Sequence, residues 1–369
     1  MSDYTVRYVD LIQRYAEEKE EIQECIDKVL SKGHLILTEE VKELEKAIID
    51  YCNVGHCVSL NSGTDALMLA LWGAGIGKND EVIVPNISFI ASIGAIVHVG
   101  ATPVICDVGE DFLIDVTQIE RHITKKTKAI MPVHWTGRTC NMKLINKIAD
   151  NYGLTVIEDA AQSMGSYVDG VHSGTSSLAG AISCHPLKNL NALGDGGLLI
   201  TNNAELAEKV RLYRNHGLRA RDDVEFFGLN SRLDVLSAEV LKFRLTKLKS
   251  VNEKRNKNAL QYMQRLDGLA EATFVRPKDC EIEARVMFLG LFEERDKLQA
   301  SLSERGIETL IYYGRPLSAH KASINLNLNI DSYPVSEKIC ESVLALPHHQ
   351  YVTEEQINFV CDQICAFYN

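Results

Sequence analysis

The feature that most limits the fold of this chain is an alternation of short apolar runs with helical segments across its first half. The predicted strands are "EVIVP" (81–85), "TPVICDV" (102–108), "KAIMPVH" (128–134) and "LTVIEDA" (154–160). The segments 92–99 and 146–153 between them carry the apolar spacing of helices. Such an alternation is typical of a mostly parallel sheet covered by helices. The sequence therefore predicts an α/β fold whose active site lies at the carboxyl ends of the strands.

The pattern of elements changes after a long predicted helix at 236–266, which contains no proline or glycine. Two amphipathic helices are predicted near the start of the chain, between residues 17 and 51. Beyond the long helix the predicted elements are shorter and mix strand and helix patterns. We therefore expect a large α/β domain over residues 1–250 and a smaller α+β domain over residues 251–369.

The charge of the chain excludes several classes of partner. Lysine and arginine number 39 against 50 acidic residues, a net charge of −11 at pH 7. Because no segment concentrates the basic residues in a patch, we expect no binding to nucleic acid or to anionic lipid. The apolar stretch at 87–105 approaches the length of a membrane span, but it contains two glycines and a proline. A buried helix followed by a buried strand explains this stretch better, and no membrane partner is predicted.

The cysteines and the N-terminal segment indicate the compartment. The ten cysteines include no CxxC spacing, and several lie inside apolar runs such as "TPVICDV". This placement predicts reduced thiols that act as small apolar side chains, and no metal site. The first residues carry charges every few positions and lack the apolar core of an export signal. We expect a cytoplasmic protein.

One motif, "NSGTDAL" (61–67), turns from a predicted strand into a predicted helix. Its small residues leave backbone N–H groups free at the start of the helix, which is a natural site for a phosphate group. A simple capping turn would use the same residue types. The motif alone therefore leaves both interpretations open.

A second motif places two acidic residues at the end of the strand "LTVIEDA". Successive strand residues point to opposite faces, so at most one of Glu158 and Asp159 faces a given cleft. Asp159 would either cap the next helix or hold a heteroaromatic nitrogen in its protonated form.

Lys188 lies in the third motif, "HPLKNLNALGDGG" (185–197). Pro186 favours a constrained loop, and a partly buried lysine on such a loop has a lowered pKa, which is the condition for a nucleophilic amine. An ordinary solvated lysine is the alternative. A phosphate site, an acid for a pyridine nitrogen and a lysine for an aldehyde are together the groups that bind pyridoxal 5′-phosphate. The combination of motifs therefore predicts this cofactor.

With these motifs, the chain resembles the sugar aminotransferases of the DegT/DnrJ/EryC1/StrS type, which have the aspartate-aminotransferase fold (fold type I). The resemblance extends over nearly all 369 residues and is most specific in "EDAAQS" (158–163) and "CHPLKNLNALGDGG" (184–197). It implies a large domain with a mixed, mostly parallel seven-stranded sheet flanked by helices, and a smaller α+β C-terminal domain. It also implies a homodimer with shared active sites.

The resemblance further implies a role for each candidate site residue. Lys188 would bind the cofactor covalently and later move a proton between substrate and cofactor, and Asp159 would pair with the pyridine nitrogen. The residues implied to hold the rest of the cofactor are Gly63, Thr64, Ser183 and Asn230 at the phosphate, Gln162 at the phenolic oxygen and Phe89 on the ring face. Asn230 would reach across from the second subunit. A core position for Phe89, a helix cap for Gln162 and a turn position for Asn230 remain as alternatives.

A few positions depart from the commonest pattern of the family. Cys184 stands where an aromatic residue is usual, and Trp135 and Arg138 stand where Tyr or Leu and Gln are more usual. The segment "YYGRPLSAHKA" (312–322) also lacks the common histidine-rich version. These segments line the substrate side in relatives, so the identity of the sugar stays open.

The function that the resemblance implies is conversion of a keto-sugar, expected to be nucleotide-linked, to an amino sugar with L-glutamate as the amino donor. A keto-cyclitol or a keto-sugar acid is an alternative substrate. A sugar dehydratase on the same scaffold would carry histidine in place of the cofactor lysine, so Lys188 argues against it. A cofactor-binding regulator would normally carry an added DNA-binding domain, and no basic helix-turn-helix extension is visible in the sequence.

Overall fold

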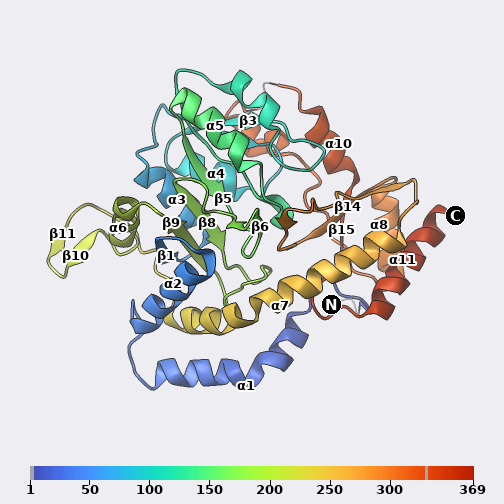
Figure 1. Ribbon diagram of the computed structural model, residues 1–369, viewed down its shortest axis with the longest axis horizontal. Helices are drawn as coiled ribbons and strands as arrows, with labels where there is room; N and C mark the ends of the chain where they lie inside the picture. The colour runs from blue at the N-terminus through green and yellow to red at the C-terminus, as the bar shows by residue number, and fades with distance from the viewer. Residues whose placement is uncertain (1–3, 329–330) are drawn as a thin grey trace.

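A seven-stranded sheet forms the centre of the computed structural model, which describes residues 4–328 and 331–369 (Figure 1). Its strands are β1 (His56–Leu60), β2 (Glu81–Pro85), β3 (Thr102–Cys106), β4 (Thr127–Ile130), β5 (Thr155–Asp159), β8 (Ala179–Ser183) and β9 (Gly197–Thr201). Their order across the sheet is β1-β9-β8-β5-β4-β2-β3. Only β9 runs antiparallel to its neighbours β1 and β8, and the other pairs are parallel. The prediction of a mixed, mostly parallel sheet is confirmed.

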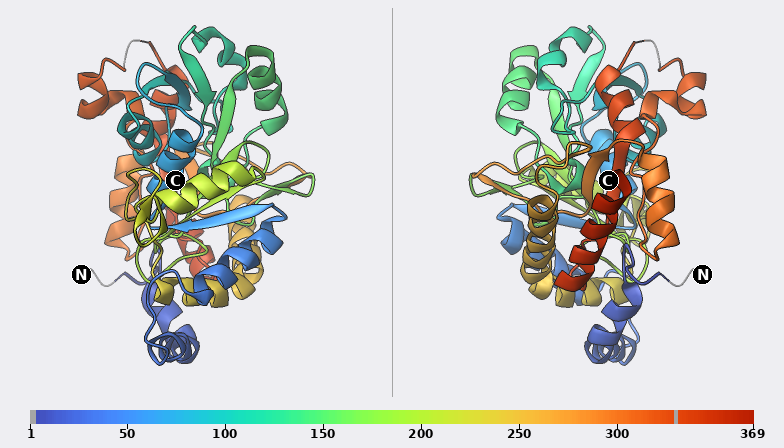
Figure 2. Two further views of the ribbon diagram at one scale, coloured as in Figure 1. Left: turned by 90° about the vertical axis from the view of Figure 1, so that its left-hand side faces the viewer. Right: turned by 90° about the vertical axis from the view of Figure 1, so that its right-hand side faces the viewer.

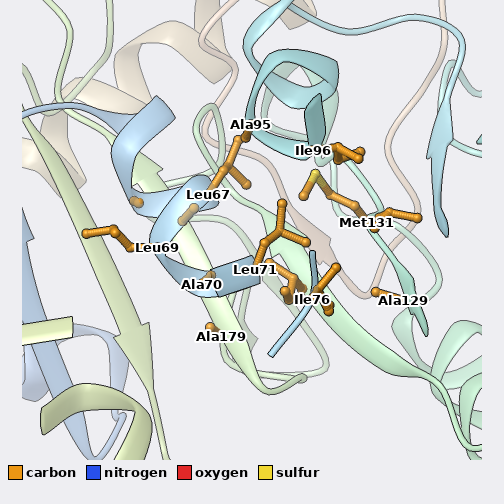
Figure 3. Packing of buried hydrophobic residues seen from close by; sticks show 14 of the residues in the cluster. Leu67, Leu69, Ala70, Leu71, Ile76, Ala95, Ile96, Ala129, Met131 and Ala179 are labelled. Atoms are coloured by element: carbon orange, nitrogen blue, oxygen red, sulfur yellow. The ribbon is translucent and has the colours of Figure 1, made fainter. Parts of the chain in front are cut away.

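Helices cover both faces of this sheet. The helices on one face are α3 (Gly63–Gly73), α4 (Ala91–His98) and α6 (Ala204–Tyr213), and those on the other are α2 (Glu39–Cys52), α5 (Met142–Tyr152) and α7 (Val235–Arg265). Figure 3 shows the first face from close by, where Leu67 and Leu71 of α3 pack with Ile96 of α4 and Met131 beyond β4. Two apolar layers therefore enclose the sheet, as parallel strands require.

The alternation of side chains along each strand explains how both apolar layers form. In β2, Val82 and Val84 belong to the cluster under α3, whereas Ile83 between them belongs to the cluster under α5. In β5, Ile157 and Val156 divide between the two faces in the same way. Since successive strand side chains point to opposite faces, an unbroken apolar run supplies both cores at once.

A smaller C-terminal part follows α7 and is built on the antiparallel sheet β12-β14-β15. Its elements are β12 (Ala272–Thr273), β14 (Phe288–Phe292), β15 (Val343–Leu346), α8 (Arg295–Glu304), α9 (Lys321–Asn325), α10 (Pro334–Ser342) and α11 (Glu354–Tyr368). α7 runs unbroken through residue 250 and packs against both α2 and α11. The division of the chain at residue 250 therefore stays a prediction.

The remaining elements are short apart from α1. They are α1 (Leu11–Leu30), the strands β6 (Tyr167–Val168), β7 (Val171–His172), β10 (Leu218–Ala220), β11 (Asp223–Val224) and β13 (Glu281–Ile282), and the 3₁₀ turns Val116–Gln118, Glu120–His122, Trp135–Gly137 and Leu317–Ala319. α1 lies beside α7 along one edge of the molecule (Figures 1 and 2).

Two local expectations can be compared with the structure. The first helix begins at Leu11, not near residue 17, because the Asp10 side chain accepts a hydrogen bond from the Gln13 N–H at 2.8 Å and so caps the helix earlier. The apolar stretch at 87–105 divides into α4 and β3, as expected. In the part of the chain that the structure describes, no helix is both long and apolar enough to cross a membrane.

Candidate active site

The carboxyl ends of the parallel strands surround a cavity of about 270 Å³. Seven of the eight residues predicted for the site line it: Gly63, Thr64, Phe89, Asp159, Gln162, Ser183 and Lys188. They come from the segments that follow β1 and β2, from the end of β5 and the loop after it, and from the end of β8 and the loop after it. Strand ends of a parallel sheet meet at one edge, which is why residues far apart in sequence converge here.

Asn230, the eighth predicted residue, does not reach this cavity. It lies in a separate, open groove with Asn61 and Arg232, and the Arg232 Nε–H donates to its side-chain oxygen at 2.9 Å. Within one chain, Asn230 is therefore not part of the cavity.

The turn after β1 presents the N-terminus of α3 to the cavity. Ser62 is the N-cap, and its hydroxyl oxygen accepts from the Asp65 N–H at 3.1 Å. The N–H groups of Gly63 and Thr64 fall in the first turn, where no preceding helical carbonyl can accept from them. These donors and the positive end of the helix dipole favour an anion such as phosphate.

Two close backbone contacts require glycine around this turn. A Cβ atom on Gly63 would lie 2.8 Å from the Ser183 Cβ, so only glycine lets Ser183 approach the start of α3. A Cβ atom on Gly197 would lie 2.1 Å from the Ser62 carbonyl oxygen. Gly197, at the end of the lysine motif, thus holds the turn against β9, whereas Gly194 has open space around it.

Asp159 lines the cavity and is 4% exposed. Its Oδ2 accepts from the Ser92 hydroxyl at 2.6 Å, and its Oδ1 accepts from the Ala161 N–H at 3.2 Å. The Ser92 oxygen in turn lies 2.7 Å from the Ser88 hydroxyl. Burial raises the pKa of Asp159 above its usual value, and the Ser92 and Ala161 hydrogen bonds oppose that rise.

Glu158 faces away from the cavity, as strand alternation predicts. Its carboxylate lies 2.8 Å from the His134 Nε2 and also accepts from the Gly174 N–H at 2.8 Å. The His134 Nδ1 accepts from the Cys140 N–H at 3.1 Å, so the ring proton sits on Nε2 and donates to Glu158. The pair is fully buried and joins β5 to the segment after β4.

Lys188 reaches the cavity from the loop after β8. Its backbone N–H donates to the His185 carbonyl at 2.8 Å, which closes a tight turn. The side chain is partly accessible through the cavity, and burial of the ammonium ion lowers its pKa to about 8, although Asp159 opposes this effect. About a tenth of the amine is therefore unprotonated at pH 7, far more than for an ordinary lysine, and a nucleophile or a base must be in this form.

Gln162 and Phe89 both line the cavity, and only the core alternative for Phe89 is excluded. The Gln162 side-chain oxygen accepts from the Thr136 N–H at 2.8 Å, which leaves its amide NH₂ group as a donor. Phe89 is 55% exposed and is not a core residue. Its ring centroid lies 6.3 Å from that of Tyr313, so the two rings border the same cavity.

Aromatic residues that the motifs did not identify also line the cavity. Tyr8 arrives from the N-terminal segment, and its ring lies 5.9 Å from that of Tyr312. Tyr313 stacks on the buried Trp135 at 6.0 Å and 17°. The segment "YYG" in the sequence could have identified Tyr312 and Tyr313 as site residues. No sequence pattern identifies Tyr8, because about 300 residues separate it from Tyr312.

The three unusual residues Cys184, Trp135 and Arg138 do not line the cavity, and Trp135 is buried against Tyr313. Cys184 is fully buried in the core between β8 and α7. The Arg138 guanidinium donates to the Glu283 carboxylate at 2.6 Å, and both side chains are buried. The segments of these residues are expected on the substrate side, but in this chain the three side chains themselves are buried in the protein interior.

The donor set of the cavity fits pyridoxal phosphate. N–H groups of α3 and the Ser183 hydroxyl suit a phosphate, a buried acid suits a pyridine nitrogen, and an amine with a lowered pKa suits an aldehyde. The glycine at position 63 leaves the room that the phosphate side needs. The residues that would hold the cofactor are those seven lining residues.

Comparison with known proteins gives consistent matches over the whole chain. The model of the DegT/DnrJ/EryC1/StrS aminotransferase family matches residues 16–365. A pleiotropic regulatory protein of Geobacillus stearothermophilus is 38% identical over 98% of each chain. A dTDP-3-amino-3,4,6-trideoxy-alpha-D-glucose transaminase of Streptomyces venezuelae is 38% identical over 97% of this chain and 95% of its own.

Solved structures agree with these sequence matches. The structure of S. venezuelae DesV superposes with a TM-score of 0.96 at 37% identity and covers 98% of both chains. The structure of NtdA from Bacillus subtilis with the bound cofactor PMP superposes with a TM-score of 0.89 at 29% identity and covers 95% of this chain and 82% of its own.

Proposed function

Since the chain belongs to the DegT/DnrJ/EryC1/StrS aminotransferase family, we propose that it transfers the amino group of L-glutamate to the ketone of a nucleotide-linked sugar. It is a sugar aminotransferase that depends on pyridoxal phosphate. The observation that carries the proposal is one cavity that holds an amine of lowered pKa, a buried acid and the open N-terminus of a helix. Relatives named as transaminases of dTDP- and UDP-linked sugars support the nucleotide-linked substrate.

Pyridoxal phosphate, when bound, supplies an electron sink for negative charge at the carbon that carries the transferred nitrogen. The side chains of this chain then divide the remaining work. The α3 N-terminus and the Ser183 hydroxyl bind the phosphate, and Phe89 covers the ring. The amide of Gln162, fixed by the Thr136 N–H, donates to the phenolic oxygen. Asp159, oriented by Ser92, holds a proton at the pyridine nitrogen.

Lys188 has two tasks in this proposal. Its amine, with a pKa of about 8, binds the cofactor when no substrate is present. Once a substrate amine has displaced it, the freed Lys188 amine would act as the base that takes a proton from the substrate carbon, and the ammonium so formed would act as the acid that gives the proton back. The same steps in reverse place the amine on the sugar, so one cavity serves glutamate and the sugar in turn.

A homodimer is part of the proposal because Asn230 lies outside the cavity of its own chain. Ile36, 62% exposed, and Leu35, 51% exposed, line the same groove, and Phe227, three residues before Asn230 in the chain, is 96% exposed. Such a surface favours burial against a second copy. In that arrangement Asn230 contacts the phosphate bound by the partner. Sedimentation or light scattering tests the dimer directly.

There are three alternatives to the proposed function: a dehydratase, an aminotransferase of another substrate class and a regulatory protein. A dehydratase on this scaffold would carry histidine at position 188, where this chain has lysine. A keto-cyclitol or a keto-sugar acid remains a substrate that the activity panel must include, since a relative named for a glucuronate derivative is 35% identical. One relative is named as a pleiotropic regulatory protein, and a measurement of catalytic turnover tests whether this chain acts as an enzyme.

The test begins with purified protein and pyridoxal phosphate. We expect visible absorption from the bound cofactor and, after borohydride reduction and peptide mapping, a stable adduct at Lys188. Addition of L-glutamate should release 2-oxoglutarate in one equivalent, and catalytic release should require a keto-sugar. An adduct on any other lysine would refute the assignment of Lys188. Turnover with a cyclitol or sugar acid but with no nucleotide-linked sugar would refute the substrate class and leave the cofactor chemistry intact.

A further inference from the structure

Beneath the loop of Lys188, two arginines share one buried carboxylate. Glu18 of α1 accepts from the Arg14 Nε–H at 3.2 Å and from the Arg244 Nε–H of α7 at 2.8 Å. The three side chains are at most 6% exposed. α1 is otherwise a surface helix, so a carboxylate buried on its inner face needs a reason.

The two guanidinium groups hold the backbone of the Lys188 loop. Arg244 donates from Nη1 to the Asn191 carbonyl at 2.8 Å and to the Ala192 carbonyl at 3.4 Å. Arg14 donates to the Asn189 carbonyl at 3.4 and 3.5 Å. These carbonyl groups belong to the residues that follow Lys188 in the chain, so α1 and α7 together hold the backbone next to the reactive amine.

Glu18 is what allows both arginines to stay at the loop. Two buried guanidinium groups repel each other, and a buried charge is strongly unfavourable when its partner is removed. The single Glu18 carboxylate binds both, and the loop carbonyls accept the remaining donors. Without this carboxylate, at least one arginine would have to move toward solvent and release the loop.

We propose that Glu18 is a positioning residue for Lys188, which acts by holding Arg14 and Arg244 against the carbonyl groups of residues 189, 191 and 192. The proposal rests on the proposed role of Lys188. It differs from a simple tie between α1 and α7 in one measurable respect. A tie would affect only stability, whereas a positioning residue also affects the order of the loop and the binding of the cofactor.

The chain offers a matched control on the same pair of helices. Glu21 of α1 bonds to Lys247 of α7 at 3.0 Å, but both side chains are about 40% exposed and neither contacts the loop. Glu18→Gln and Glu21→Gln therefore remove the same charge from the same helix, and only the first change affects groups that hold the loop.

The experiment compares both variants with the unaltered holoenzyme by amide hydrogen exchange of the peptide over residues 185–193, by the dissociation constant of pyridoxal phosphate and by kcat of the glutamate half-reaction. For Glu18→Gln we expect about tenfold faster loop exchange and a kcat lower by about 100-fold, as for a reactive group displaced by about 1 Å. The cofactor should also bind about tenfold more weakly, and Glu21→Gln should stay within about twofold on every measure.

A triple variant, Arg14→Met with Glu18→Leu and Arg244→Met, separates positioning from stability. Apolar replacement of a whole buried charge cluster often preserves stability, but methionine and leucine cannot donate to the loop carbonyls. We expect a melting temperature near that of the unaltered protein with fast loop exchange and weak cofactor binding. This variant keeps the proposal testable even if Glu18→Gln does not fold.

Two results would overturn the proposal: a Glu18→Gln variant with the loop exchange of the Glu21→Gln control, or a triple variant with normal exchange and normal cofactor binding. Absence of an adduct at Lys188 in the unaltered protein would instead refute the proposed function. In that case the exchange measurement would still show whether Glu18 orders the loop.

Discussion

Replacement of Ser92 by alanine is the most direct test of how the protein controls Asp159. The Ser92 hydroxyl donates to Asp159 Oδ2 at 2.6 Å, and both side chains are buried. A hydrogen bond to a charged group contributes about 1.5–3 kcal/mol, which is more than one to a neutral carboxyl group contributes, so its loss should raise the pKa of Asp159 further. Ser88→Ala, which removes only the 2.7 Å hydroxyl contact to Ser92, should cost about 0.5–1.5 kcal/mol.

The pH dependence of this cost follows from the direction of the shift. Burial already raises the pKa of Asp159 in the folded protein, so the folded state keeps its proton at a pH where the unfolded chain has lost it. The resulting penalty is absent below the unfolded pKa of about 4 and complete above the folded pKa. Ser92→Ala enlarges that penalty, so it should cost about 1.5–3 kcal/mol at neutral pH and no more than about 1.5 kcal/mol at acid pH, where the hydrogen bond involves a neutral carboxyl group.

The measurement is urea denaturation of the cofactor-free protein at pH 7.5 and at the lowest pH where it stays folded. Ser92→Ala, Ser88→Ala and the unaltered chain are compared at both pH values. An equal cost of Ser92→Ala at both pH values would refute the conclusion that Ser92 supports a charged Asp159. The conclusion would also be refuted if Ser92→Ala lowered the free energy of unfolding as much in an Asp159→Asn background as in the unaltered chain.

Four further predictions test other parts of the protein. Lys188→Ala should abolish the borohydride-stable adduct and lower kcat by about 10²–10⁴-fold or more. In the unaltered cofactor-free protein, the rate at which an amine reagent modifies Lys188 should reach half its maximum at about pH 8. The reason is that only the deprotonated amine reacts, and burial lowers its pKa to about 8. Gly197→Ala would place a Cβ 2.1 Å from a carbonyl oxygen of the turn before α3, so it should destabilise the protein by about 1–3 kcal/mol and weaken cofactor binding in an absorption titration. Gly194→Ala, with open space around it, is the control and should leave both quantities unchanged, which a similar loss in the two variants would contradict. Arg138→Met leaves the buried Glu283 carboxylate with Arg285, 2.9 Å away, as its remaining partner, so in thermal denaturation it should cost less than the about 3–5 kcal/mol of an uncompensated buried charge, while KM for the sugar stays within about twofold. A large change in KM alone would place Arg138 at the substrate site.

Much of the site could be predicted from the sequence because its chemistry is local to strand ends. Asp159 closes an apolar strand, Ser62 and Gly63 open a helix, and Ser183 closes a further strand of the same direction as the first. Parallel strands bring their carboxyl ends to one edge, so the position of a residue at a strand end already predicts its neighbours in space. The cofactor followed from the turn after β1, from Asp159 and from Lys188 in the loop after β8 taken together, although each motif alone had an ordinary structural explanation.

Other features depended on contacts that no local pattern encodes. Tyr8 meets Tyr312, and Arg138 meets Glu283, only because the segments that carry them pack against the opposite part of the chain. Ser92 lies inside an apolar helix, where nothing marks its hydroxyl as the partner of Asp159.

The sequence by itself determined the alternation of strands and helices, the two faces of the sheet and the chemical groups at its carboxyl edge, because periodicity and residue type act over a few neighbours. The tertiary structure alone decided which buried groups pair. It placed the Glu18 carboxylate between two arginines under the Lys188 loop, and it kept Asn230 outside the cavity of its own chain. Pairing of this kind depends on how α1, α7 and the C-terminal part fold back on the sheet, over separations of 100 to 300 residues that sequence patterns do not encode.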